Sequence, residues 1–248
     1  MKQVYSTVFF FIMLFIGCEI AAERDNDADN KEDVLQEDYL PIAIDSCALE
    51  DSIKFKGLIN VQEINPDIRV HLRYSGLNNF LNKDIYGCLT NACLQTETAE
   101  MLSEAQEELS TRDPNLHLLI WDAARPRSVQ WKMWNTLEMP IAQKTRYVSN
   151  PRNGSIHNYG CAVDLTICEA DGKQLDMGTD FDYFGKTANT NMEFILVQNG
   201  ELNYQQLDNR KLLRQVMRKA GFNTISSEWW HFNAMSRAEA RKRYEIVE

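Results

Sequence analysis

The chain has 248 residues, of which 25% are charged, and its formal net charge is −10. No basic patch is present, which argues against a nucleic-acid-binding protein. Beyond residue 40 there is no internal repeat and no low-complexity run, so the remaining length suits one domain with a sizeable core.

Residues 1–18 have the pattern of a signal peptide. A positive charge precedes an almost wholly apolar run over residues 8–16, which is too short to span a bilayer comfortably. The sequence Phe-Ile-Gly-Cys that ends at Cys18 is similar to a lipobox, at which Cys18 would be lipidated; ordinary cleavage after Ala22 is the alternative. Either reading predicts export, and the lipobox predicts a periplasmic or outer-membrane bacterial lipoprotein that contacts membrane only through its N-terminal lipid anchor.

An acidic segment follows. Residues 19–38 hold nine acidic residues against two basic ones, a net −7 of the total −10. Such a composition cannot bury enough apolar surface to order itself. We therefore expect residues 19–50 to be a disordered acidic tether and residues 51–248 to be the folded domain.

Hydrophobic periodicity predicts the elements of that domain. The expected strands cover residues 58–64, 68–73, 117–121 and 162–167, and the expected helices cover 96–109, 128–137 and 208–220. Asp208 is the expected N-cap of the last helix, and Gly221 follows its end. Because strands and helices do not alternate regularly, we expect an α+β domain with an antiparallel central sheet flanked by helices.

Five cysteines follow Cys18, and this odd number requires at least one to be free or intermolecular. Cys88 and Cys93 are close enough in sequence for a small disulfide loop, which an exported protein permits. For Cys161 and Cys168 the simplest expectation is a free, buried thiol.

Two short motifs about seventy residues apart carry the chemistry: Ser-Ile-His-Asn-Tyr-Gly-Cys-Ala-Val-Asp at 155–164, and Glu-Trp-Trp-His at 228–231. Three possible metal ligands are His157, Asp164 and His231. Three protein ligands with an open fourth position are the pattern of a catalytic zinc site. Glu228 is a further carboxylate that could move protons. Unrelated surface or core histidines are the alternative, and a thiolate ligand from Cys161 has to be considered.

The motif SxHxxGxAxD followed by ExxH resembles the D-Ala-D-Ala dipeptidases, the VanX-like branch of the zinc D,D-peptidases. Other blocks resemble the family in the same order: Leu72-Arg73-Tyr74, Asn79-Phe80, Ile85-Tyr86-Gly87, residues 121–126 (WDAARP) and residues 176–182 (DMGTDFD). The resemblance covers roughly residues 55–235. It implies a fold of the Hedgehog/D,D-peptidase type and a non-ligating residue at Cys161.

The resemblance also implies a role for each site residue. One zinc ion would be held by His157, Asp164 and His231. Glu228 would be the general base, and Arg125, oriented by Asp122, would stabilise the negative charge that develops on the carbonyl oxygen.

Three further residues match family residues that hold the substrate. Asp182 would pair with the substrate ammonium with help from Tyr74, and Ser155 would hydrogen-bond near the carboxylate end. An acceptor for the ammonium is what would make an enzyme prefer dipeptides to longer chains.

The expected function is therefore zinc-dependent hydrolysis of the small dipeptide D-Ala-D-Ala in the cell envelope, for cell-wall turnover or D-alanine salvage. Export argues against a role in glycopeptide resistance, which requires a cytoplasmic enzyme. A D,D- or L,D-carboxypeptidase acting on muropeptides and a non-catalytic zinc module that binds wall peptides remain alternatives. The sequence leaves the oligomeric state open.

Overall fold

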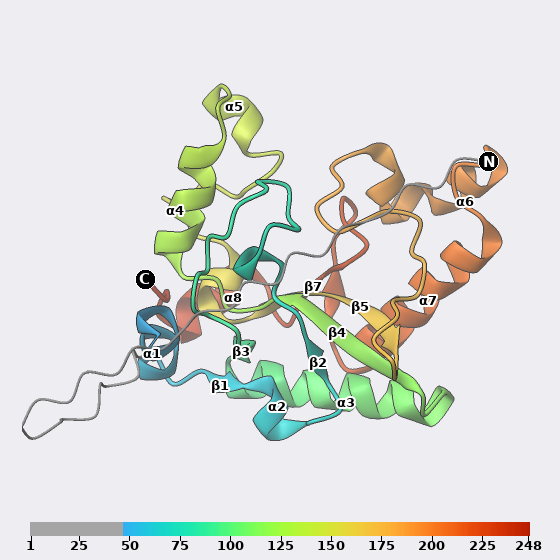
Figure 1. The fold of residues 1–248 in the computed structure, drawn as a ribbon, viewed down its shortest axis with the longest axis horizontal. Helices are drawn as coiled ribbons and strands as arrows, with labels where there is room; N and C mark the ends of the chain where they lie inside the picture. Colours follow the sequence, from blue (N-terminus) through green and yellow to red (C-terminus); the bar gives the residue numbers. More distant parts are fainter. Residues whose placement is uncertain (1–46) are drawn as a thin grey trace, which may run out of the picture. The chain divides into compact units, whose positions relative to one another are not determined.

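A five-stranded sheet organises the domain in a computed structural model that describes residues 47–248 (Figure 1). The strand order is β2-β4-β5-β7-β6. The strands are β2 (Arg69–Val70), β4 (Leu116–Asp122), β5 (Ala162–Glu169), β6 (Asn223–Thr224) and β7 (His231–Asn233). The expected signal segment and all of the expected tether before residue 47 lie outside the described residues.

The sheet is antiparallel except at one edge. Strands β4, β5, β7 and β6 pair antiparallel, as predicted, whereas β2 pairs parallel to β4. A parallel pair needs a long crossover, and the chain between these two strands contains a complete helix, α3 (Thr96–Arg112). The predicted antiparallel sheet is therefore confirmed for four strands and was wrong at this edge, and the mixed α/β single-domain class holds.

Strands β4 and β5 form the buried centre of the sheet. Val163, Leu165 and Ile167 of β5 belong to the hydrophobic core. Because side chains alternate along a strand, Asp164 and Thr166 project from its opposite face. The pairing of β4 with β5 is interrupted between Ile120 and Asp122, an irregularity at the point where β4 ends.

Helices surround the sheet, and α3 runs along it in contact with β4 and with α7 (Tyr204–Lys219) (Figure 1). The other α-helices are α1 (Ala48–Phe55), α2 (Val61–Ile64), α4 (Arg127–Thr136), α5 (Ile141–Lys144), α6 (Glu193–Gln198) and α8 (Arg237–Arg243). Short 3-10 turns are η1 (Arg73–Ser75), η2 (Ile156–Tyr159), η3 (Lys186–Ala188) and η4 (Thr190–Met192). None of the helices within residues 47–248 combines the length and apolar content needed to cross a bilayer.

The helices predicted from periodicity are present, but one begins earlier than expected. Helix α3 buries one face, which includes Ala99, Leu102, Ala105 and Leu109. Helix α7 is capped by Asn203 and not by Asp208. The Asn203 side chain accepts from the Gln206 backbone at 2.8 Å, and the Gln206 side chain accepts from the Asn203 backbone at 2.8 Å. This reciprocal capping box is the sequence signal that the prediction missed.

The start of the domain also differs from the prediction. The expected strand over residues 58–64 is a two-residue strand, β1 (Ile59–Asn60), paired with β3 (Cys93–Leu94) and followed at once by α2. Asn60 ends the strand because its side chain accepts a hydrogen bond from the Gln62 backbone at 3.2 Å and so caps the helix. Helix α1 begins at Ala48, so the folded domain starts before the expected boundary at residue 51.

The small disulfide loop that the spacing of Cys88 and Cys93 would allow does not form, because Cys88 is joined to Cys47. Cys93 is a buried free thiol in β3, and Cys161 and Cys168 are buried free thiols as expected. Disulfide pairing depends on which β-carbons lie within bonding reach in the folded chain, and spacing along the sequence does not report this.

Candidate active site

The structure brings His157, Asp164 and His231 together. One ligand atom from each lies within 4.8 Å of the others. His157 Nε2 is 3.2 Å from His231 Nδ1 and 3.4 Å from an Asp164 oxygen, and Asp164 Oδ1 is 2.8 Å from His231 Nδ1. Two imidazole nitrogens and a carboxylate oxygen around one point are a donor set that suits a divalent metal ion.

Backbone pairing produces this convergence. Asp164 and His231 are directly opposed residues of the antiparallel strands β5 and β7. His157 lies in η2, just before β5, and Gly160 turns the chain back with a φ of +67°. A side chain at Gly160 would be strained at this φ, and its Cβ would lie 2.4 Å from a methyl carbon of Leu58.

The second nitrogen of each histidine is held by an oxygen acceptor. His157 Nδ1 lies 2.8 Å from the Ala123 carbonyl oxygen, and His231 Nε2 lies 2.9 Å from Asn233 Oδ1. An oxygen acceptor at that distance favours a proton on the nitrogen facing it. His157 Nε2 and His231 Nδ1 would then present lone pairs towards Asp164, so the residues present fit a metal ion.

The charges of these groups reinforce one another. Burial opposes ionisation of Asp164, but the charges and hydrogen bonds of His157 and His231 outweigh it and lower the Asp164 pKa. Burial likewise opposes a charged imidazole at His231, but the hydrogen bond and charge of Asp164 raise its pKa to about 9, so a metal ion that binds His231 Nδ1 would displace a proton from it. Asp164 is therefore an ionised carboxylate, the form in which it could bind a cation.

A fixed guanidinium lies beside the cluster. Arg125 Nε donates to Asp122 Oδ2 at 2.9 Å, and Arg125 Nη2 lies 3.7 Å from Asp164 Oδ2. Asp122 is fully buried and also accepts from the hydroxyl of Tyr86. Arg125 further lies over the ring of Tyr74, 5.3 Å from its centroid. These contacts leave the guanidinium with one orientation.

Glu228 lies in the loop immediately before β7, outside the strand. Its side chain lines the same pocket as the candidate metal-binding group, which is His157, Asp164 and His231. It makes no hydrogen bond to any residue in 47–248. Burial raises the pKa of Glu228, although the positive charge of His231 opposes the shift. A carboxylate that is neither a ligand nor paired is available to exchange protons.

Asp182 and Tyr74 meet at another wall of the pocket. The Tyr74 hydroxyl donates to the Asp182 carboxylate at 3.0 Å, although the two residues are 108 positions apart in the chain. Asp182 has a φ of +59°, a left-handed conformation unusual for a residue with a side chain. Among residues 47–248 it has no basic partner within 4 Å, and burial raises its pKa well above the ordinary value.

Ser155 completes the set of predicted pocket residues. It is buried, and its hydroxyl donates to Gln130 Oε1 at 2.8 Å. The Gln130 amide in turn donates to the Ser149 carbonyl oxygen at 2.7 Å. The hydroxyl is thus held at the pocket wall with lone pairs available to a ligand.

Eight of the nine predicted site residues, all except Asp122, line one pocket of about 240 Å³. Several lining residues were not anticipated from the sequence, among them Arg146, Phe184, Asn233 and Arg237. For Asn233 a signal existed, because residues two apart on a strand share a face and His231 is two positions earlier. For the exposed Arg146 and Arg237, no motif in the sequence pointed to the pocket.

Cys161 does not join the metal-binding group, which is consistent with the expectation that it is not a ligand. Its thiol contacts the Tyr159 carbonyl oxygen at 3.4 Å. Burial raises the pKa of Cys161 to about 12, so the thiol stays protonated at neutral pH.

A largely buried His-Asp-His group beside an unpaired glutamate and an oriented arginine is the arrangement of a metal-dependent hydrolase. Comparisons with known proteins agree with this class. Residues 54–247 match the peptidase family M15, described as D-ala-D-ala dipeptidase. The chain belongs to this family, and it is a metallopeptidase.

Relatives of the chain carry the same description. It is 34% identical over 178 residues to the D-alanyl-D-alanine dipeptidase of Escherichia coli (strain K12), an alignment that covers 71% of this chain and 83% of that one. It is 29% identical over 191 residues to the D-alanyl-D-alanine dipeptidase of Enterococcus faecium, covering 71% and 90% respectively. These similarities support hydrolysis of a dipeptide.

Proposed function

We propose that the protein is a zinc-dependent dipeptidase that cleaves D-Ala-D-Ala. The observation that carries the proposal is the single pocket in which His157, Asp164 and His231 converge beside Glu228 and Arg125. The substrate is proposed from the names of the relatives, and zinc from the donor set of two imidazoles and one carboxylate. A zinc ion bound there would supply Lewis-acid polarisation of the attacking water and the scissile carbonyl.

In this mechanism Glu228 moves the protons. Its carboxylate accepts a proton from the attacking water and then donates that proton to the leaving amine. Because it is not hydrogen-bonded to any described residue, it can turn from one position to the other without breaking an existing contact. Burial, which raises its pKa, makes the protonated form easier to reach.

Arg125 stabilises charge on the substrate. Attack on the carbonyl develops negative charge on its oxygen, and a cation held in place beforehand stabilises that charge more than it stabilises the neutral substrate. The contacts of Arg125 with Asp122 and with the Tyr74 ring hold it in place.

Asp182 supports a dipeptide as the substrate. Its half-buried carboxylate faces the pocket with a tyrosine hydroxyl but no described cation as its partner. A substrate ammonium would supply the missing positive charge. Only a dipeptide has its free N-terminal ammonium on the residue directly before the scissile bond. Ser155 would hydrogen-bond the substrate near its carboxylate end.

The position of Asp182 favours a dipeptidase over a carboxypeptidase that acts on longer wall peptides, because an acyl chain would have to pass the same carboxylate. The presence of both Glu228 and Arg125 in the pocket argues against a module that only binds, since binding alone needs neither.

The test is release of D-alanine from D-Ala-D-Ala by the purified protein loaded with one equivalent of zinc. We expect turnover by the native chain, a loss of about 10²-fold or more in Glu228→Gln, and no change in Glu100→Gln, an exposed glutamate of α3. Cleavage of a pentapeptide stem but not of the dipeptide would replace the proposal with the carboxypeptidase.

We also propose a place for the enzyme in the cell envelope, where it would act in cell-wall turnover or D-alanine salvage. This proposal comes from the signal-like pattern of residues 1–18 and the cysteine at position 18. Fractionation of cells that produce the full chain, with Cys18→Ala as the control, would test it. Membrane association of the native chain that disappears in the variant is expected, and recovery of the native chain in the cytosol would contradict the proposal.

A further inference from the structure

A second cavity lies beside the active site and is larger than it. Its volume is about 430 Å³, and none of the residues assigned above to metal, substrate or proton transfer lines it. The two sites share four segments of the chain. In each segment one residue lines this cavity and a residue one or two positions away lines the active site. The pairs, with the residue of this cavity first, are Arg73 and Tyr74, Thr166 and Asp164, Phe181 and Asp182, and Trp229 and Glu228. A volume of this size lies in the range of small-molecule sites.

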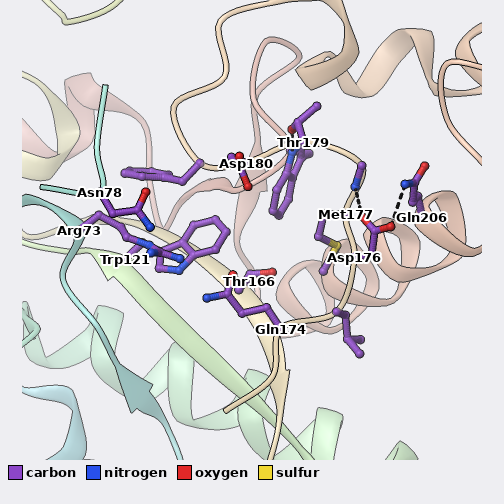
Figure 2. A pocket seen from close by; sticks show the side chains of 14 residues that line it. Arg73, Asn78, Trp121, Thr166, Gln174, Asp176, Met177, Thr179, Asp180 and Gln206 are labelled. Atoms are coloured by element: carbon purple, nitrogen blue, oxygen red, sulfur yellow. Dashed lines mark hydrogen bonds between the residues drawn. The ribbon is translucent and has the colours of Figure 1, made fainter. Parts of the chain in front are cut away.

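Buried polar atoms without a partner are concentrated in this cavity. Among residues 47–248 five buried side-chain polar atoms make no hydrogen bond, and three of them belong to lining residues: Arg73 Nε, Trp121 Nε1 and Thr166 Oγ1. Figure 2 shows Arg73 and Trp121 together on one side of the cavity, and Thr166 near Gln174. A buried donor without an acceptor is costly, so three around one cavity call for a ligand that accepts hydrogen bonds.

Arg73 adds an unpaired positive charge. It is only 9% exposed, and within the described residues its guanidinium has no carboxylate within 4 Å and no hydrogen-bond acceptor. Its one strong contact is with the ring of Trp121, whose centroid lies 5.2 Å away. A buried cation is expensive unless an anion completes it, and a carboxylate matches the planar guanidinium with two parallel hydrogen bonds.

A residue of the opposite charge also lines the cavity. Asp180 is exposed there and makes no hydrogen bond to another described residue, so its carboxylate is free (Figure 2). The other acid of the cavity, Asp176, is already occupied by the Gly178 backbone at 2.8 Å and by the Gln206 amide at 2.9 Å. The cavity therefore offers donors and a positive charge from buried residues and one unpaired carboxylate from an exposed residue, whose negative charge acts on Arg73 without an ion-pair contact.

We propose that this cavity is a second binding site, distinct from the active site, for a small molecule with a carboxylate and an ammonium group, that is, a free α-amino acid. The carboxylate would contact Arg73, Trp121 and Thr166, and the ammonium would face Asp180. This assignment is independent of the dipeptidase activity proposed above. The competing occupant is water alone, which would satisfy the same donors but would not depend on the solute.

The experiment is calorimetric titration of the zinc-loaded full chain with D-alanine, acetate and ethylamine. We expect D-alanine to bind, acetate to bind more weakly, and ethylamine not to bind. Arg73→Gln should lower the affinity for D-alanine by about ten-fold or more, since a hydrogen bond to a charged group is lost. Asp180→Asn should lower the affinity for D-alanine but not for acetate.

Two further variants distinguish this site from the active site and from a folding defect. Thr166→Val keeps the shape of the side chain while removing the unpartnered hydroxyl, so it should fold with a Tm at or above that of the native chain and still bind D-alanine more weakly. Asp182→Asn alters the active site and should leave D-alanine binding unchanged. Loss of binding in Asp182→Asn with retention in Thr166→Val would place the amino acid in the active site and overturn the proposal, as would the absence of any binding.

Discussion

Asp164 and His231 are directly opposed residues of two antiparallel strands, and Asp164 Oδ1 lies 2.8 Å from His231 Nδ1. Two of the three proposed metal ligands are therefore set by the register of one strand pair. A slip of one residue would turn one of these side chains to the other face of the sheet and separate them. The third proposed ligand, His157, is placed by the short turn before β5.

Removal of the Asp164 carboxylate should abolish stable metal binding. In Asp164→Asn the two imidazoles remain, but the negative charge that lies between them is lost. We expect zinc content after gel filtration, measured by elemental analysis, to fall from one equivalent to well below one. Asp51→Asn, at an exposed position of α1, is the matched control and should retain the full equivalent. Full zinc content in Asp164→Asn would show that Asp164 is not a ligand.

Asn233 should tune the metal affinity without being a ligand. Its side-chain oxygen lies 2.9 Å from His231 Nε2 and orients the ring. Loss of such a partner usually costs about 10–100-fold in metal affinity, so Asn233→Ala should lower the zinc affinity by that factor in competition with a chelator. Asn135→Ala, an exposed asparagine of α4, should have no effect. An unchanged affinity in Asn233→Ala would remove the residue from the metal site.

Arg125 should act on the chemical step. Lysine keeps the charge but cannot reproduce the planar contact with Asp122, so in Arg125→Lys the cation is no longer held in one place. We expect kcat on D-Ala-D-Ala to fall by about 10²-fold or more with a much smaller change in KM. Arg112→Lys, in an exposed ion pair of α3, is the control. A rise in KM at constant kcat would instead assign Arg125 to substrate binding.

The disulfide between Cys47 and Cys88 should stabilise the start of the domain. It closes a loop across a sequence separation of 41 residues, and loop-closure entropy for that length corresponds to about 4 kcal/mol as an upper value. The double variant Cys47→Ser/Cys88→Ser should unfold at a lower denaturant concentration than the native chain. A reducing agent should lower the midpoint of the native chain but not that of the variant. Equal midpoints without reductant would mean that the bond adds no stability.

The three free thiols should be unreactive in the folded protein. Burial raises the pKa of Cys93 to about 11 and that of Cys161 to about 12, and burial also raises the pKa of Cys168. A raised pKa keeps a thiol protonated to higher pH, so the reactive thiolate is scarce at pH 8 and increases as the pH rises. Peptide mapping after alkylation should find all three unlabelled in the native state and labelled in denaturant. Rapid native labelling of Cys93 at pH 8 would contradict its burial.

Much of the local chemistry could be read from the sequence. The apolar spacing of α3 and the apolar run of β4 correspond to the observed elements because each reflects burial of one face, which is a local property. The choice of His157, Asp164 and His231 followed from residue types that bind metal and from the family pattern.

Other features depended on contacts between distant segments. Nothing near Cys47 or Cys88 in sequence indicates their pairing, and the parallel pairing of β2 with β4 depends on the path of the chain through α3. The start of α7 and the short strand β1 were misread because the side chains of Asn203 and Asn60 cap helices, a contact that periodicity does not register.

The sequence by itself determined which side chains can bind a metal, accept a proton or stabilise an oxyanion, because these are properties of the residue types. Only the tertiary structure decided that they meet, since strand register and chain turns set distances between residues that are far apart in the chain. The same holds for the second cavity: Arg73, Trp121 and Thr166 come from three separate segments, and their unpaired donors become visible only when the fold buries them together.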